Sequence, residues 1–274
     1  MITQEHSRQS VPALFGLHDR VVAVIGAGSG IGEAVAHACA GLGATVACLD
    51  IDVDAAQRVS EDLKGAGASG AEAARMDILD GEGVRTYLSD LAARHGRLDG
   101  VVCTPAINVR KPILSYTAEE FQKVVNMNLG GSFNVLQSAG RIMKDAGRGS
   151  IVLFSSIRAK VVEPGQSVYA ATKSGIIQLA RTAAAELSPH GVRVNALTPG
   201  VVETPLTKPI KSQPDWYKAY ADHNALGRWA QPMEMAGPTA FLLTDAASYI
   251  TGSAMYVDGG WTAIDGRFQP PGMS

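Results

Sequence analysis

The sequence predicts an α/β fold: a single Rossmann-type domain with a doubly wound, seven-stranded parallel sheet and helices on both faces. Short apolar, β-branched runs alternate with Ala- and Leu-rich segments of helical spacing, as in parallel sheets with helical crossovers. The glycine cluster 26–32 joins the first apolar run to the first helical segment. At 274 residues and 46% hydrophobic content the chain can bury a large core, and no linker or repeat divides it.

Each expected strand is an apolar run bounded by turn residues, and each helix follows the next turn. The expected strands are 20–25, 44–50, 71–76, 98–103, 149–155, 192–197 and 254–257. The expected helices are 33–42, 53–64, 81–94, 117–127, 129–146, 167–187 and 233–244. The stretch 200–231 is long for a connection in such a sheet and is predicted to be a substrate-binding loop. We expect a flexible N-terminus over 1–15 and a C-terminal tail over 262–274 within the one domain 1–274.

Charge and composition narrow the function. The formal net charge is −2 without a basic block, so electrostatics do not favour nucleic-acid or membrane-surface partners. Three scattered cysteines without a CxxC pair, and six histidines that do not cluster, indicate neither a disulfide framework nor a metal site. The N-terminus lacks the apolar core of a signal peptide, and no apolar run reaches membrane-spanning length. We expect a cytoplasmic protein with no metal.

The glycine cluster is placed to bind phosphate, because it lies between a buried strand and the start of a helix. Glycines allow the backbone to approach a pyrophosphate, and the helix N-terminus presents free N–H groups. The spacing Gly26-x-x-x-Gly30-x-Gly32 differs from the general G-x-G-x-x-G pattern, and a flexible turn is the alternative. Asp50 ends the next strand, where an acid can accept both ribose hydroxyls and repel a 2′-phosphate. Ser29 and Ile51 occupy the positions where an NADP site would want a cation, so NAD is predicted. The alternative for Asp50 is a strand-end cap.

A second group of residues carries acid–base chemistry. Tyr169 and Lys173 lie four residues apart on a predicted helix and therefore share one face. A fixed ammonium favours the phenolate of a tyrosine, whose ordinary pKa of about 10 makes it a poor base. Ser156 follows a predicted strand and can hold the reacting oxygen. The alternative is a solvated helix face, where Tyr and Lys at this spacing are common.

With these residues in place, the chain resembles the short-chain dehydrogenase/reductase family over residues 15–262. The resemblance rests on Gly26, Gly30, Gly32, Asp50, Asp77, Asn128, Ser156, Tyr169, Lys173, Asn195, Pro199, Gly200 and the run 257–260. It implies four catalytic residues. Tyr169 would be the general acid/base and Ser156 would orient the substrate oxygen. Lys173 would lower the tyrosine pKa and hold the nicotinamide ribose, and Asn128 would anchor a proton-relay water. Ser155 is expected to be structural.

The resemblance also implies a cofactor site and a homotetramer. The cofactor residues would be Gly26, Ser29, Gly30, Ile31, Gly32, Asp50, Ile51, Asp77, Ile78, Thr104, Ala106, Tyr169, Lys173, Pro199, Gly200, Val202 and Thr204. Asp77 and Ile78 would border the adenine, and Thr204 would reach the nicotinamide amide. The chain departs from the family at 103–106, where Cys-Thr-Pro-Ala replaces Asn-Asn-Ala-Gly and Pro105 removes an N–H. That change puts the adenosine-side contacts in doubt, and Cys103 itself is expected to be inert packing.

The substrate is predicted only as a class. Segment 108–112 and the last third of the chain look like family members acting on polyols, sugar acids and hydroxy or keto acids. Arg158 would pair with a carboxylate or a hydroxyl-rich substrate, unless it is an exposed loop arginine. Trp216 would line the substrate pocket, unless the aromatic residues of the long loop pack its own core. Arg267 and Phe268 would touch a neighbouring subunit, unless the tail is disordered.

The alternatives to this alcohol dehydrogenase are three. One is a 3-oxoacyl-thioester reductase-like enzyme, and another is an epimerase or dehydratase of the extended branch of the family. The third is a non-catalytic dinucleotide-binding protein, against which the presence of all four catalytic residues argues.

Overall fold

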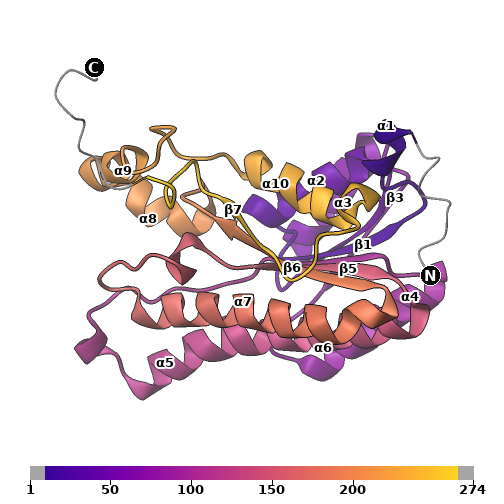
Figure 1. The fold of residues 1–274 in the computed structure, drawn as a ribbon, viewed down its shortest axis with the longest axis horizontal. Helices are drawn as coiled ribbons and strands as arrows, with labels where there is room; N and C mark the ends of the chain where they lie inside the picture. The colour runs from indigo at the N-terminus through magenta and orange to yellow at the C-terminus, as the bar shows by residue number, and fades with distance from the viewer. Residues whose placement is uncertain (1–9, 265–274) are drawn as a thin grey trace.

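The computed structural model describes residues 10–264 and confirms the predicted architecture. Seven parallel strands form one sheet in the order β3-β2-β1-β4-β5-β6-β7, with helices on both faces (Figure 1). The strands are β1 Val21–Ile25, β2 Thr45–Asp50, β3 Gly70–Arg75, β4 Gly100–Cys103, β5 Gly149–Phe154, β6 Val192–Pro199 and β7 Ala254–Val257. Every expected strand is present within one or two residues.

Two helical layers enclose the sheet. One layer holds α4 (Gly81–His95), α6 (Gly131–Ala146) and α7 (Ser167–Leu187), and the other holds α2 (Gly30–Gly41), α3 (Val53–Gly65) and α10 (Pro232–Leu243). Along β1, Val21, Ala23 and Ile25 pack into the first layer while Val22 and Val24 pack into the second. Because successive strand residues face opposite sides, a strand buried on both faces reads as the unbroken apolar run seen in the sequence.

The two helices expected on either side of residue 128 form one continuous column. α5 (Ala118–Val125) begins at a capping box on Thr117 and passes into a π-helical segment, η3 (Asn126–Gly130), before α6. Gly131 N–H donates to the Asn126 carbonyl, which widens this turn. The expected break is therefore wrong, and a π turn holds Asn128 in its place. Such turns are frequent at functional sites.

The long predicted loop contains helices that the sequence analysis did not expect. It comprises η6 (Pro205–Thr207), α8 (Lys208–Lys211) and α9 (Pro214–Ala221), which lie on the same side of the molecule as the start of α7 (Figure 1). These helices close over a small apolar cluster of Ile157, Val201, Ile210, Tyr220, Trp229 and Trp261. We call residues 200–231 the lid.

The chain ends are described only in part. Residues 11–14 of the expected flexible N-terminus form a helical turn, α1 (Val11–Leu14), and Phe15 stacks on Phe241 at 6.1 Å between ring centroids. Residues 1–9, and the predicted tail contacts at Arg267 and Phe268, lie outside the described residues. Within residues 10–264, no helix is both long and apolar enough to span a membrane.

Candidate active site

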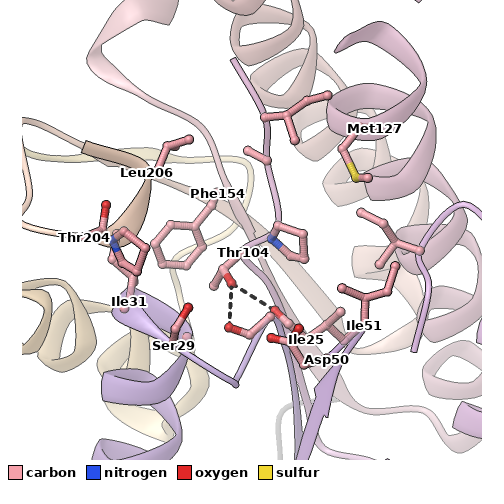
Figure 2. Close-up of a pocket in the computed structure, with 18 of the residues that line it drawn as sticks. Ile25, Ser29, Ile31, Asp50, Ile51, Thr104, Met127, Phe154, Thr204 and Leu206 are labelled. Atoms are coloured by element: carbon pink, nitrogen blue, oxygen red, sulfur yellow. Dashed lines mark hydrogen bonds between the residues drawn. The ribbon is translucent and has the colours of Figure 1, made fainter. Parts of the chain in front are cut away.

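A cavity of about 330 Å³ lies at the carboxyl ends of the central strands. Figure 2 shows Asp50 and Ile51 on one side of it, Thr204 and Leu206 on the other, and Thr104 between them. The order of the strands changes direction between β1 and β4, and crevices at such a point are where open α/β sheets bind ligands. The cavity therefore lies where a nucleotide is expected.

The glycine turn brings bare backbone to the wall of this cavity. Gly26 has φ +84°, and a Cβ there would lie 2.3 Å from Thr104 Oγ1. A Cβ on Gly32 would lie 1.9 Å from the Gly26 carbonyl oxygen, so only glycine allows the first turn of α2 to pack this closely. Gly28 is needed for a related reason, because its Cβ would lie 2.9 Å from Asp50 Oδ2. Steric contact therefore fixes the conformation of this turn, and the alternative of a merely flexible turn is not supported.

Asp50 lies at the end of β2, where its carboxylate lines the cavity and braces the glycine turn. Its Oδ2 accepts from Gly28 N–H at 2.8 Å, and its Oδ1 accepts from Asp52 N–H at 3.0 Å. The sequence analysis missed one cation nearby: Arg58 donates to the Gly28 carbonyl at 3.0 Å and to Glu33 at 2.8 Å. Arg58 comes from the middle of α3, too far along the chain for the local pattern to indicate it.

The unusual segment after β4 preserves the packing of the turn. Thr104 N–H donates to the Ile25 carbonyl at 3.1 Å, and Thr104 Oγ1 donates to the same oxygen at 3.0 Å (Figure 2). Pro105 lies against Gly26, with its Cγ and Cδ each 3.1 Å from the position of a Cβ on that glycine. Cys103 is 2% exposed, and burial raises the pKa of its thiol to about 11, so it is held as an unreactive thiol.

Most of the predicted cofactor residues line the cavity. They are Gly26, Ser29, Gly30, Ile31, Gly32, Asp50, Ile51, Asp77, Ile78, Thr104, Ala106 and Thr204. Sequence reasoning missed Ile25, Met76, Pro105, Ile107, Met127, Phe154, Pro205 and Leu206, which are apolar and carry no motif. Three other predicted residues lie beside the cavity and not in its lining. Pro199 ends β6, Gly200 packs on Asp258, and Val202 is buried in a bridge to Ala230. The bare turn and the strand-end acid fit a dinucleotide.

Ser156, Tyr169 and Lys173 come together beside Phe154, a residue of the cavity wall. Lys173 is 2% exposed, and its Nζ donates to the Phe154 carbonyl at 2.7 Å and lies 5.6 Å from the centroid of the Tyr169 ring. The Ser156 side chain lies close enough to the Tyr169 hydroxyl to lower its pKa. Burial lowers the pKa of Lys173 to about 8. The helix-face prediction is therefore confirmed in its geometry, and the reading of a solvated face is wrong for Lys173.

The balance of effects on Tyr169 differs from the expectation. Burial raises the pKa of Tyr169, and the side chain of Ser156 and the charges of Arg110 and Arg158 lower it by less. Lys173, expected to keep this pKa low, is not among the groups that shift it, and its own pKa of about 8 leaves it mostly protonated at neutral pH. The cations that act on the phenol in this structure include two arginines, of which only Arg158 was named from the sequence.

Asn128 fixes the segment after β4 against α7. Its Oδ1 accepts from Ile107 N–H at 2.8 Å, and its Nδ2 donates to the Ile107 carbonyl at 2.9 Å and to Thr172 Oγ1 at 3.1 Å. The side chain is completely buried. Ser155, expected to be structural, is buried too and donates to the Lys173 carbonyl at 2.8 Å.

The two predicted substrate residues lie in the lid cluster. Arg158 is 7% exposed, so the reading of an exposed loop arginine is wrong. Its Nη2 forms an ion pair with Glu163 at 2.6 Å, and its guanidinium lies over the Trp261 ring at 5.3 Å. Trp216 packs edge-on against Tyr220 at 6.0 Å and lies under the Arg110 guanidinium at 5.1 Å. Trp216 thus contributes to the lid's own core.

Comparison with known proteins identifies the class of this fold and site. A family model described as enoyl-(acyl carrier protein) reductase matches residues 26–262. The chain is 37% identical over 245 residues to the (3R)-3-hydroxyacyl-CoA dehydrogenase of Homo sapiens, covering 86% of this chain and 93% of that protein. It is also 37% identical over 247 residues to the cis-4-hydroxycyclohexanecarboxylate dehydrogenase of Sinomonas cyclohexanicum, covering 90% of this chain and 98% of that protein.

A solved structure agrees with these relatives. The gluconate 5-dehydrogenase of Burkholderia cenocepacia J2315, in complex with NADP and tartrate, superimposes with a TM-score of 0.89 at 28% identity over 93% of this chain and all of that one. The protein belongs to the short-chain dehydrogenase/reductase family. It is therefore an oxidoreductase of a family that uses NAD(P).

Proposed function

We propose that the protein is an NAD-dependent oxidoreductase that interconverts a secondary alcohol and its ketone by hydride transfer. The observation that carries this proposal is the grouping of Ser156, Tyr169 and Lys173 beside Phe154, which lines the cavity. A non-catalytic dinucleotide-binding protein has no need of this arrangement. We further propose that the enzyme is a cytoplasmic homotetramer, on the family resemblance alone.

The side chains divide the proton chemistry among them. In alcohol oxidation, Tyr169 takes the hydroxyl proton of the substrate at its phenolic oxygen, and in ketone reduction it returns that proton. Ser156 would donate a hydrogen bond to the reacting oxygen, and Lys173, anchored on the Phe154 carbonyl, would stabilise the phenolate and help to hold the ribose of a bound cofactor. Asn128 positions the backbone at Ile107 and supports the proton relay. A nicotinamide cofactor held by these residues would supply the hydride chemistry.

The preference for NAD rests on Asp50. Its carboxylate faces the cavity at the place where an adenosine ribose would lie, and a 2′-phosphate there would meet a negative charge. Solved relatives bind NADP, and Arg58 donates to the Gly28 carbonyl close by, so the preference needs a direct test. We expect NADH to bind at least about tenfold more tightly than NADPH, and Asp50→Ser to remove most of that difference. Tighter binding of NADPH by the unaltered protein would contradict the preference.

We propose a small polyol, sugar acid or hydroxy/keto acid as the substrate class. The names of two similar proteins specify a hydroxylated cyclohexane acid and a gluconate, and two guanidiniums, of Arg110 and Arg158, lie near Tyr169 in this chain. The second candidate is a 3-oxoacyl-thioester reductase-like enzyme, which the hydroxyacyl-CoA relative favours.

The deciding experiment measures NADH formation from NAD over a substrate panel. The panel contains polyols, sugar acids, cyclic hydroxy acids and 3-hydroxyacyl thioesters, with NADP run in parallel. Turnover confined to polyols and acids supports the first candidate, and turnover confined to thioesters supports the second. No turnover of any alcohol, together with intact NADH binding, contradicts the proposal and favours the non-catalytic alternative.

A further inference from the structure

Glu163 lies in the loop between Ser156 and α7, and its carboxylate collects hydrogen bonds from four side chains. Arg158 Nη2 lies 2.6 Å away and Arg110 Nη1 lies 3.2 Å away. The Tyr220 hydroxyl donates to it at 2.6 Å, and Gln166 Nε2 donates at 2.5 Å. These partners come from the segment after β4, the loop itself, the lid helix α9 and the turn before α7. One carboxylate thus joins four segments of the chain that are separate in sequence or secondary structure.

The charges of this group do not cancel. Two guanidiniums share a single carboxylate, so a formal excess of one positive charge remains. Arg158 is 7% exposed and the Glu163 side chain is 20% exposed, so water screens the group only weakly. Arg158 adjoins the active site, because its backbone N–H donates to Ser156 Oγ at 3.2 Å, and the charges of Arg158 and Arg110 both act to lower the pKa of Tyr169. Arg110 is the more accessible of the two, with a side chain 33% exposed.

We propose that Glu163 is a specificity-determining residue that sets how strongly the active site at Tyr169 attracts a substrate carboxylate. Its carboxylate neutralises one of the two arginines and leaves the charge of the other for a single acidic group on the substrate. The inference rests on the proposed function, because it takes Tyr169 as the point where substrate reacts. The charge selectivity of the active site would then depend on Glu163, a residue that belongs to no motif.

The Glu163 carboxylate also holds the lid through Tyr220, and this effect on the lid must be separated from the effect on charge selectivity. Tyr220 belongs to α9 and packs on Trp229 at 5.6 Å and on Trp261 at 5.6 Å. Tyr220→Phe removes the hydroxyl that bonds Glu163 while leaving the ring packing and all three charges unchanged. A role of Glu163 in lid closure alone would therefore appear in Tyr220→Phe, whereas a role in charge selectivity would not.

The test uses binding, so that it does not depend on turnover. Cyclohexanecarboxylate and its uncharged match, cyclohexanecarboxamide, are titrated by calorimetry into the protein saturated with NADH at low ionic strength. The readout is the ratio of the two dissociation constants, amide over acid. In Glu163→Gln we expect this ratio to rise about 5-fold, the effect of a unit charge at roughly 8 Å in an effective dielectric of about 40. Glu163→Asp, which keeps the charge, and Tyr220→Phe are expected to stay within about twofold of the unaltered protein.

Arg110→Gln provides an independent arm, because Arg110 is exposed and its loss should not disturb folding. It removes the surplus charge, so the ratio should fall by about 5-fold. An unchanged ratio in Glu163→Gln, with melting temperature and NADH affinity preserved, would overturn the inference. Should Glu163→Gln fail to fold, an unchanged ratio in Arg110→Gln would overturn it equally. Absence of alcohol turnover in the unaltered protein would instead contradict the proposed function, and the binding ratios would still decide the role of Glu163.

Discussion

The side of the site proposed to hold the cofactor and the side proposed to hold substrate are built by different means. On the cofactor side, the glycine turn 26–32 and the ends of β1 and β2 present mostly backbone, held by contacts such as Gly28 N–H to Asp50 at 2.8 Å. On the substrate side, the lid and the loop 157–166 are held by buried ion pairs and stacked rings around Glu163. A site made of backbone tolerates few residue types and leaves a pattern in the sequence. A site made of paired side chains can be formed by many combinations of residues, and it leaves no pattern in the sequence.

Tyr169→Phe should separate the two sides most sharply. It removes the hydroxyl proposed to exchange a proton with substrate but changes no residue of the cavity lining. General acid–base catalysis contributes about 10²–10⁴-fold, so we expect kcat to fall about 10³-fold. NADH affinity, measured by fluorescence titration, should change by less than about twofold because no charge and little volume are lost. A fall in kcat of less than about tenfold would show that Tyr169 is not the proton donor.

Gly32→Ala should damage the cofactor side alone. The new Cβ would lie 1.9 Å from the Gly26 carbonyl oxygen, and backbone on both sides leaves no flexible atom to move. We expect NADH binding to weaken about 100-fold or more and the melting temperature to fall, both of which titration and calorimetry would show.

Gly41→Ala is the matched control on the same helix. A Cβ at Gly41 meets nothing within 4 Å, so alanine should stabilise α2 by about 0.5–1 kcal/mol and leave NADH binding unchanged. Equal losses in the two variants would mean that the tight packing of the turn is not what forms the cofactor site.

The contrast between the two sides explains what could be predicted from the sequence. The central strands were predictable because they are buried on both faces, and the glycine turn because steric contact at Gly26 and Gly32 admits no side chain. Tyr169 and Lys173 were predictable because helical spacing alone places them on one face. In each case the pattern that indicates the structure lies within a short stretch of the sequence.

The remaining features depend on contacts between distant segments. The π turn at Asn128 follows from side-chain bonds to Ile107 and Thr172, and a helical pattern does not distinguish it from a break. Helices α8 and α9 are short, and their place is set by packing on Trp229 and Trp261. Glu163 meets Arg110 across 53 positions and Tyr220 across 57, so no window on one sequence can pair them. The raised pKa of Tyr169 likewise depends on burial, which spacing does not report.

Lys173 lies between the cofactor side and the substrate side, and its titration tests how far water is excluded from that position. Burial lowers the pKa of Lys173 from 10.5 to about 8. At pH values between these two, the unfolded chain binds the proton that the native protein has released. Stability then rises with pH. In the protein without cofactor, the free energy of unfolding of the unaltered chain relative to Lys173→Met should increase by about 2 kcal/mol from pH 8 to pH 10. Denaturant unfolding at several pH values measures this, and a flat difference would place Lys173 in contact with water.

Thr104→Val should give the smallest effect and shows how far the cofactor side relies on backbone. Valine keeps the shape of threonine but removes the hydroxyl that donates to the Ile25 carbonyl at 3.0 Å, while the backbone bond from Thr104 N–H to the same oxygen at 3.1 Å remains. Loss of one neutral hydrogen bond costs about 1 kcal/mol, so NADH affinity should weaken about 3- to 5-fold with kcat unchanged. A loss near that of Gly32→Ala would mean that this one side chain, and not the glycine backbone, holds the turn in place. An unchanged affinity would mean that the main-chain bond alone keeps the end of β4 against the turn, even with Cys-Thr-Pro-Ala in place of the usual family residues.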